Sequence, residues 1–414
     1  MRTFGSAVPV LIALAAARIV SAQEERVFFG ILHSHTSFSD GSGVPSEAFK
    51  HAREKAKCDF FAITEHNHAV QIHPKEPREG EKPVGTDHSL YNGTGATGPK
   101  PLIQAANEAT VNGSFVALYG QEFSSISSGN HMNVFDVPEV IDVSNGSFRK
   151  LVDWVNDPNH FDTTHHPAIL QLNHPSALLR KKGLEYGDDD FGSQRGWYRA
   201  MNPLACTIEI INGPGTVEGE HHPVPSSFEK DYEFYLSDGL HVAPTADQDN
   251  HFKTWGTLTT ARTGIIAKEL TKPSILGAIR DRHVYATSDS NLRVIARVNG
   301  HLTGDIITPP KNGTKLTIEI SISDDDEPNA RYSVKAVAGE SGGLKAPDDV
   351  SSASRTGNGV VKITDVKYTG GDEYVYFKIT QTNADGKADH AWTAPIWLDP
   401  NASEDPAVPD SDDE

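Results

Sequence analysis

Residues 27 to about 290 repeat one pattern, and this pattern constrains the fold more than any other feature of the chain. Short apolar runs end in polar or histidine-bearing turns: VFFGILH, CDFFAITEH, FVALYGQEF, HMNVFDV, AILQLNHP, CTIEIING and LHVAPTADQDNH. Helical candidates lie between several of them: PSEAFKHAREKAK, FRKLVDWVN and PSILGAIRDRH. Strands that alternate with helices predict parallel strands in an α/β fold. The carboxyl ends of such strands are where these folds build their sites.

The pattern changes after about residue 290. Five segments of alternating apolar and polar residues follow, separated by Gly, Asn and Asp turns: LRVIARVNG, KLTIEISISD, RYSVKAVAG, VVKITDVKY and YVYFKITQT. No helical pattern interrupts them, so we expect residues 291–400 to form a small all-β sandwich that packs against an α/β domain of residues 23–290. His301 and His390 are isolated in this part, and we assign them no chemistry.

Three further segments lie outside these patterns. Residues 1–22 hold Arg2, the apolar run AVPVLIALAAA and small residues before Ala22, as a cleaved signal peptide does. The glycine- and proline-rich insertion at residues 69–113 predicts a long surface loop that either roofs a site or has no functional role. Residues 401–414 form an acidic tail that we expect to be disordered.

These features predict the compartment and exclude some partners. No apolar stretch of about 18 residues follows the signal, so we expect a secreted protein without a membrane span. The net charge of −19 makes long nucleic acid or an anionic membrane a poor partner, and a small molecule the better expectation. Five Asn-x-Ser/Thr sequons are candidates for N-glycosylation: Asn92, Asn112, Asn145, Asn312 and Asn401.

The chain has two cysteines, Cys58 and Cys206, and each comes just before or at the start of an apolar run. A disulfide and a pair of buried thiols are equally compatible with this placement. Two cysteines in 414 residues exclude a fold built on disulfides.

Histidines and carboxylates gather at the ends of the apolar runs. His33 and His35 are two residues apart, so a strand directs both to the same face. Glu122 ends the third run, where a buried carboxylate must be paired, protonated or bound to a metal. Other run ends supply more candidates: Asp40, Glu65, His66, His68, His131, His174, Asp247, Asp249 and His251. Each alone is most simply a core or surface residue, but together they form a nitrogen and oxygen ligand set suited to Zn, Mn or Fe.

At this point the sequence resembles a known family. HSHTSFSDG, AITEHN, the glutamate of YGQEF, LNHPS and DNH resemble the successive motifs of the PHP (polymerase and histidinol phosphatase) superfamily over residues 27–290. The resemblance implies a distorted seven-stranded β/α barrel that holds two or three divalent metal ions. QDNHFKTWG and the ending AWTAPIWL are similar to the secreted or periplasmic CehA/McbA-like metallohydrolases.

The resemblance also implies how the ligands are shared among the ions. It assigns one metal to His33, His35, Glu122 and Asp249. Glu122 would bridge to a second ion held by His131 and His174, and a third would be bound by Asp40, His66 and His251.

Several nearby residues keep open roles. Glu65 stands where the family has Asp; it either orients a ligand histidine or donates a proton to a leaving group. His68 is a second candidate proton donor, or an exposed loop histidine. Asp247 competes with Asp249 as a ligand, although the Asp-x-His spacing favours Asp249. Glu209 faces the same rim, either in structural hydrogen bonding or in function.

These observations predict a secreted, metal-dependent hydrolase in which metal ions activate water, so that no serine or cysteine nucleophile is needed. Phosphate esters are the leading substrate class, and Lys253 and the cluster at 180–182 are candidate phosphate-binding cations. A carboxyl or carbamate ester hydrolase of CehA type would share the same ligands. A non-catalytic binding protein is the remaining alternative, although a degenerate site would be expected to have lost ligands.

Overall fold

The computed structural model describes residues 24–67, 87–93, 99–124, 131–144, 147–160, 167–175, 201–213, 215 and 225–402. Several sequence-based predictions fall outside these ranges: the signal peptide, His68, the basic cluster at 180–182, Asn145 and the tail from residue 403. None of the described helices is long and apolar enough to cross a membrane.

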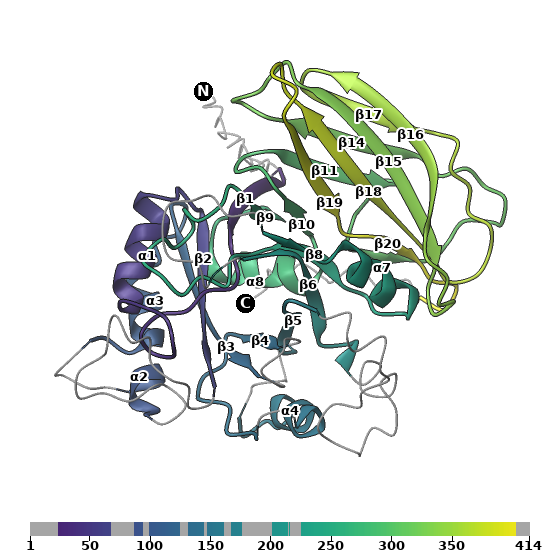
Figure 1. Cartoon of the computed structure of the whole chain (residues 1–414). Helices are drawn as coiled ribbons and strands as arrows, with labels where there is room; N and C mark the ends of the chain where they lie inside the picture. The colour runs from purple at the N-terminus through teal and green to yellow at the C-terminus, as the bar shows by residue number, and fades with distance from the viewer. Residues whose placement is uncertain are drawn as a thin grey trace, which may run out of the picture.

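The first three predicted apolar runs form neighbouring strands of a parallel sheet. Strands β1 (Arg26–Ile31), β2 (Phe60–His66) and β3 (Val116–Phe123) lie next to one another in this order and run parallel. Helix α1 (Pro45–Glu54) connects β1 to β2; it has proline in its first turn and buries Ala48, Phe49 and Ala52 on one face. Figure 1 shows α1 beside the sheet, with α3 (Leu102–Ala109) next to it.

The prediction for the insertion at residues 69–113 needs a correction. In its described part the structure places α3 and the short helix α2 (Ser89–Asn92). Leu102, Ala105 and Ala106 of α3 are buried against the same core as Phe49 of α1. Part of the insertion is therefore a packed layer of the fold, because its LIQAANEA segment has apolar residues at helical spacing.

The expectation of parallel strands holds only in part. Strand β4 (Met132–Phe135) runs antiparallel to β3 and to β5 (Ile169–Leu172). Strand β9 (Arg262–Ala267) is antiparallel to β1, and β10 (Val284–Thr287) is antiparallel to β9. The connection from β3 to β4 is too short for the crossover that parallel neighbours require.

The remaining strands of this part extend the sheet. Strand β6 (Ala205–Asn212) pairs in parallel with β5 and with β8 (Ala243–Ala246), and antiparallel with β7 (Ser226–Ser227). Among the described strands, β8 pairs only with β6. The fold is therefore mixed α/β with a large sheet, and a closed seven-stranded β/α barrel is not confirmed. The other helices among the described residues are α4 (Phe148–Val155), α7 (Glu229–Ser237) and α8 (Lys272–Arg280).

We call residues 26–287 the first region and residues 293–398 the second region. The second region contains strands and no helix, and each of its five alternating segments contains a strand. One four-stranded sheet comprises β11 (Arg293–Val298), β12 (His301–Leu302), β14 (Ile318–Ser323) and β17 (Gly359–Ile363). Figure 1 shows the second region as the green and yellow strands beside β10.

The other strands of the second region continue the large sheet of the first. They are β13 (Ile306–Ile307), β15 (Arg331–Glu340), β16 (Asp348–Thr356), β18 (Glu373–Thr382), β19 (Ala388–Thr393) and β20 (Ile396–Leu398). Strand β10 pairs with β19, so the backbone ladder crosses between the regions. The cores cross as well: Trp397 packs with first-region residues, and Phe29 packs with second-region residues.

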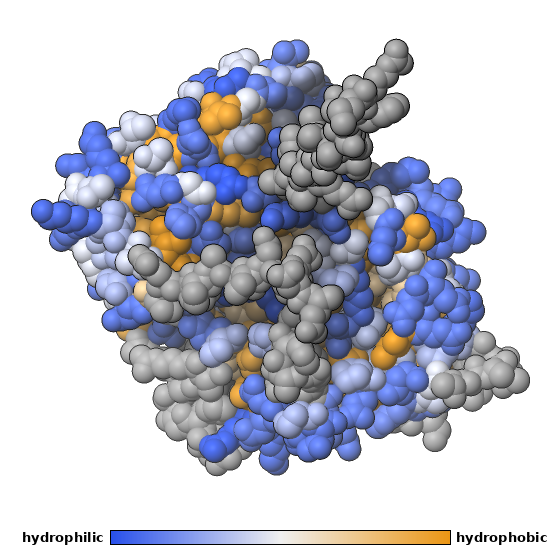
Figure 2. Space-filling model, turned by 180° about the vertical axis from the view of Figure 1, so that it is seen from behind, coloured by the Kyte–Doolittle hydropathy of each residue, from blue (hydrophilic) through white to orange (hydrophobic). Residues whose placement is uncertain are grey.

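Two smaller predictions can be followed on the described residues. Cys58 and Cys206 are both buried free thiols, which decides the cysteine question against a disulfide. The asparagines of four sequons, Asn92, Asn112, Asn312 and Asn401, are exposed. On the face shown in Figure 2 the described surface is mostly hydrophilic, and its apolar patches are interrupted by polar side chains.

Candidate metal centre

His33 and His35 follow strand β1 and enter the interior side by side. The backbone of this segment is held in extended form: His35 N donates to Asn250 O at 2.9 Å, and Thr64 N donates to Ser34 O at 2.9 Å. Both rings are fully buried, and their Nε2 atoms lie 3.2 Å apart. Two imidazole nitrogens therefore face one point, as the i, i+2 spacing predicts.

Glu122, at the end of β3, is the centre of the cluster. Its carboxylate oxygens lie 3.1–3.4 Å from ring nitrogens of five histidines: His33, His35, His66, His131 and His174. The side chain is only 1% exposed, and Asn173 Nδ2 donates to it at 3.0 Å. A buried carboxylate with this many nitrogen neighbours is suited to bridging two cations.

Asp249 completes a first group of ligands. Its Oδ1 lies 3.1 Å from His35 Nε2 and 3.4 Å from His33 Nε2. The ligand atoms of these three residues and of Glu122 lie within 4.8 Å of one another and can hold a metal ion. This is the set that the resemblance assigns to one metal.

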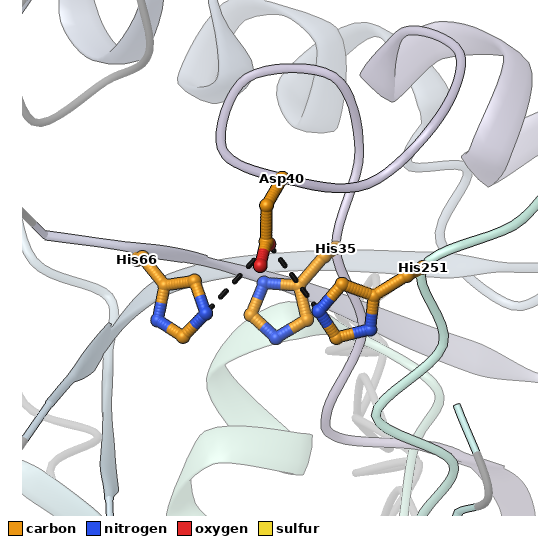
Figure 3. Close-up of side chains that lie close together, drawn as sticks. All are labelled: His35, Asp40, His66 and His251. Atoms are coloured by element: carbon orange, nitrogen blue, oxygen red, sulfur yellow. Dashed lines mark ion pairs between the residues drawn. The ribbon is translucent and has the colours of Figure 1, made fainter. Parts of the chain in front are cut away.

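A second group shares His35 with the first, and Figure 3 draws its four side chains. Asp40 Oδ1 points between His251 Nε2, at 3.2 Å, and His66 Nε2, at 3.6 Å. Buried Asp40 Oδ1 has no hydrogen-bond partner among the described residues. An oxygen in this position, facing imidazole nitrogens from separate segments, fits a cation among them. His35 joins the predicted trio in this group, with its ring stacked on His66 at 4.6 Å.

The third group is built on Glu122. His66, Glu122 and His131 can hold an ion together, with His66 Nδ1 and His131 Nδ1 each 3.1 Å from the carboxylate. His174 Nε2 is also 3.1 Å from Glu122 Oε1, and its ring lies 4.9 Å from that of His131. The structure thus brings all nine predicted ligands into one continuous cluster.

The charges of the cluster are strongly coupled. Burial alone would lower the pKa of His35, but Asp249 and Glu122 raise it to about 10. Burial would raise the pKa of Glu122, yet His33 and its neighbours hold it well below its usual value. Burial, helped by the charge of His35, lowers the pKa of His66 to about 3 despite Glu122. Divalent ions would replace protons on these histidines, so metal binding should release protons and weaken in acid.

Glu65 supports the loop that carries Asp40. It is fully buried at the end of β2 and accepts hydrogen bonds from Thr36 N at 2.9 Å, from Thr36 Oγ1 and from Ser39 Oγ. Its Oε2 lies 3.9 Å from His35 Nδ1. Both oxygens of Glu65 thus hold the 36–39 turn, which leads to the predicted ligand Asp40.

Asp247 and Asp249 have different surroundings. Asp247 is fully buried and accepts from Leu32 N at 2.5 Å and from Gln171 Nε2 at 3.1 Å. Burial, with the charge of Glu209, raises the pKa of Asp247 to about 7. Of these two aspartates, only Asp249 reaches the histidine nitrogens.

The predicted phosphate-binding Lys253 is half exposed and pairs with Glu47 at 3.7 Å.

The loop that carries Asp249 and His251 is held by an unusual backbone. Asp249 has a φ of 47°, which non-glycine residues rarely adopt. His251 N donates to Gly215 O at 2.9 Å, and a Cβ at Gly215 would lie 1.4 Å from Asp249 O. Any side chain at position 215 would therefore displace the ligand loop.

Sequence reasoning gave no role to several residues that contact the ligands. Ser39 Oγ lies 3.3 Å from His35 Nδ1, Ser124 Oγ lies 3.1 Å from His66 Nδ1, and Asn173 donates to Glu122. Asn173 and Ser124 directly follow strands, and this position is the sequence feature that could have marked them as site residues. Small polar residues are too common at strand ends for it to be decisive.

Comparison with known proteins adds little. No protein-family model matches the chain, and no curated protein matches it. Among solved structures, it is similar to a two-domain protein containing a predicted PHP-like metal-dependent phosphoesterase from Bacteroides vulgatus. That match has 15% identity and a TM-score of 0.43, and covers 90% of this chain and 95% of that chain. The PmoD soluble domain from Methylocystis matches 26% of this chain and 89% of its own, with 9% identity and a TM-score of 0.17. Both similarities are too low to argue from, so the functional argument depends on the site.

Proposed function

We propose that this chain is a metal-dependent hydrolase of the PHP type that cleaves phosphate esters of small molecules. The observation that carries the proposal is Glu122, a buried carboxylate within 3.4 Å of five histidines. Asp40 and Asp249 extend this cluster into three groups, each able to hold an ion. Nitrogen and oxygen ligands without cysteine suit Zn, Mn or Fe in a hydrolytic site.

The residues have separable roles in this proposal. His33, His35, Glu122 and Asp249 would hold one ion, His131 and His174 with Glu122 a second, and Asp40, His66 and His251 a third. Ions held there would lower the pKa of water from about 15.7 toward about 7 and neutralise charge on the attacked ester. Glu65 keeps the 36–39 turn in place, and Asn173 orients the carboxylate of Glu122.

The outer ligands leave an approach for substrate. The side chains of Asp40 and Asp249 are 27% and 22% exposed, and those of His131 and His174 are 14% and 18% exposed. His33 and His35, by contrast, are fully buried. A hydrolytic site requires such a difference in exposure between inner and outer ligands, since water and ester must reach the ions from one side.

The compartment and the subgroup belong to the same proposal. The residue 1–22 pattern supports secretion, with cleavage near Ala22, and the exposed sequon asparagines are compatible with N-glycosylation.

Lys253 pairs with Glu47 on the surface, which weakens one argument for a phosphate substrate. A CehA-type carboxyl or carbamate ester hydrolase is therefore the second candidate, since it needs the same ligands and no phosphate-binding lysine.

The test is hydrolysis by the protein after removal of bound metal and reloading with Zn²⁺ or Mn²⁺. The substrates are p-nitrophenyl phosphate, bis(p-nitrophenyl) phosphate and p-nitrophenyl acetate, assayed with the wild type, His33→Ala and His301→Ala. His301 is a matched control because its side chain is 55% exposed and lies in the second region. We expect turnover of a phosphate ester that His33→Ala and a chelator both abolish and His301→Ala retains.

The other outcomes separate the alternatives. Metal-dependent turnover of the acetate alone, lost in His33→Ala, would support the carboxyl ester hydrolase. Bound metal without turnover of any of the three esters would contradict a general esterase and favour a binding protein. Failure of the wild type to retain any metal would overturn the metal centre itself.

A further inference from the structure

We infer that Glu209 is a positioning residue that holds ligands of two metal positions at once, through the ring of His33 and the backbone of His174. This inference depends on the proposed metal centre, but it assigns a task that the nine ligands do not perform. It also decides between the two roles that the sequence left open for Glu209.

Glu209 is a carboxylate in the middle of a strand that is buried along its whole length. It lies on β6 between Ile208 and Ile210, both of which are buried in a hydrophobic core, and it is itself 0% exposed. A carboxylate at such a position is costly unless hydrogen bonds replace the lost water. The structure provides three donors from three segments of the chain.

The first contact sets the chemical form of His33. Glu209 Oε1 lies 2.7 Å from His33 Nδ1, and an ionised carboxylate can only accept, so the proton of a neutral ring belongs on Nδ1. The other nitrogen, Nε2, is then free to bind an ion. It points at Glu122 Oε1, 3.2 Å away, and at Asp249 Oδ1, 3.4 Å away. A carboxylate that fixes a ligand histidine in this way orients the ring and makes it a stronger ligand.

The second oxygen acts on a different ligand. Glu209 Oε2 accepts from His174 N at 2.5 Å and from the side-chain amide of Asn212. His174 has a φ of 27°, an unfavourable value for a residue with a side chain. The hydrogen bond to Glu209 compensates for this strain and directs His174 Nε2 toward Glu122 Oε1, 3.1 Å away.

A glutamine cannot replace both contacts. It has the shape of glutamate, but one of its two positions is an NH₂ donor. If the NH₂ faces His33, the ring must move its proton to Nε2, where it blocks metal binding. If it faces His174 N, two donors oppose each other and the strained backbone loses its support. Both orientations disturb a ligand.

The test compares wild-type protein with Glu209→Gln and Asp247→Asn. Asp247 is a matched control because it is an equally buried carboxylate that accepts from Leu32 N and Gln171, and its hydrogen bonds reach no ligand ring. Each protein is loaded with Co²⁺, and its d–d absorption spectrum reports the ligand geometry. Zn²⁺ affinity is measured by competition with a chelator, and urea unfolding shows that each protein is folded.

We expect Glu209→Gln to change the Co²⁺ spectrum and to weaken Zn²⁺ binding about 10- to 100-fold, the usual cost of losing a partner behind a ligand. Asp247→Asn should keep the wild-type spectrum, even if it is less stable. A Glu209→Gln spectrum identical to that of the wild type would overturn the inference and leave the metal centre standing. Equal spectral changes in both variants would also overturn it, because any lost carboxylate would then suffice. A wild type that binds no Co²⁺ would contradict the metal centre instead.

A second measurement applies if Glu209→Gln does not fold. Protein with ¹⁵N-labelled histidine, loaded with Zn²⁺, should show His33 protonated on Nδ1, with His33→Gln used to assign its signal. A His33 protonated on Nε2 would overturn the inference.

Discussion

In the first region strands β1, β2 and β6 are buried along almost their whole length, whereas strand β14 of the second region buries every other residue. Polar side chains on these first-region strands therefore have no surface to face, and several of them meet near the strand ends as buried histidines and carboxylates. On β14 the polar residues turn outward, and His301 and His390 of the second region are exposed. The difference shows how burial separates residues of the same type: histidines gather in the candidate metal centre in one region and face solvent in the other.

The largest expected effect tests this contrast with one buried carboxylate from each region. Glu122→Gln keeps the shape of the side chain but removes the charge that five histidines share. We expect it to lower metal content and to reduce kcat/KM more than about 100-fold, beyond the usual cost of losing a residue behind a ligand. Metal analysis and ester hydrolysis measure both.

Asp324→Asn is the control for Glu122→Gln. Asp324 is equally buried in the second region, but it accepts only from backbone N–H groups and Gln381 in the described contacts. It should leave metal content and turnover unchanged. Equal loss in both variants would break the contrast between the regions.

A smaller effect should appear in the second region as stability alone. Ile320 is fully buried on β14, so Ile320→Ala should leave a cavity and lower the free energy of unfolding by about 2–5 kcal/mol. Metal content per folded molecule should not change. Urea unfolding and metal analysis test this, with the exposed neighbour Ser321→Ala as the control, expected within about 0.5 kcal/mol of the wild type. Loss of metal in folded Ile320→Ala would mean that the second region helps to shape the centre.

The smallest effect concerns the contact between the regions. His241 packs on Trp397 with ring centroids 4.9 Å apart, and its Nε2 is buried without a hydrogen-bond partner among the described residues. Burial, with the charge of Arg282, lowers the pKa of His241 from 6.5 to about 4. Between pH 6.5 and 4 the unfolded chain binds a proton that the folded chain does not. Stability should therefore fall as the pH falls, by up to about 1.4 kcal/mol per pH unit from this residue.

His241→Phe keeps a ring against Trp397 but cannot take up a proton. Urea unfolding of the wild type and of the variant at pH 7 and pH 5 isolates the residue, because every other titrating group is common to both proteins. The stability of the variant should decline less over this interval. Parallel declines would show that protonation of His241 is not linked to unfolding.

The candidate site was more predictable from the sequence than the strand directions. His33 and His35 share a face because of strand geometry, and a glutamate at the end of an apolar run, such as Glu122, must find buried partners. Both arguments are local. The direction of β10 cannot be predicted from the local sequence. Helix α8 lies between β9 and β10, as in a parallel crossover, yet the two strands are antiparallel. Tertiary packing decides that choice.

Glu209 shows a second limit of sequence reasoning. The alternation in IEIING places Glu209 on the face opposite to Ile208 and Ile210, and it is buried as well because both faces of β6 are covered. The sequence does not indicate which residues its oxygens reach. One oxygen contacts His33, which follows strand β1, and the other accepts from the backbone of His174, which follows strand β5. Contacts between distant segments depend on the curvature and register of the sheet, and a one-residue shift would point Glu209 away.

The ladder between β10 and β19 has a practical consequence for anyone who would divide this protein. Cutting near residue 290 would separate Tyr285 from Thr393 and Thr287 from Ala391 and leave β10 as an open edge. An exposed edge lined with apolar residues pairs readily with other chains, so the isolated first region should aggregate on expression. The first region, which contains the candidate metal centre, therefore cannot be handled alone.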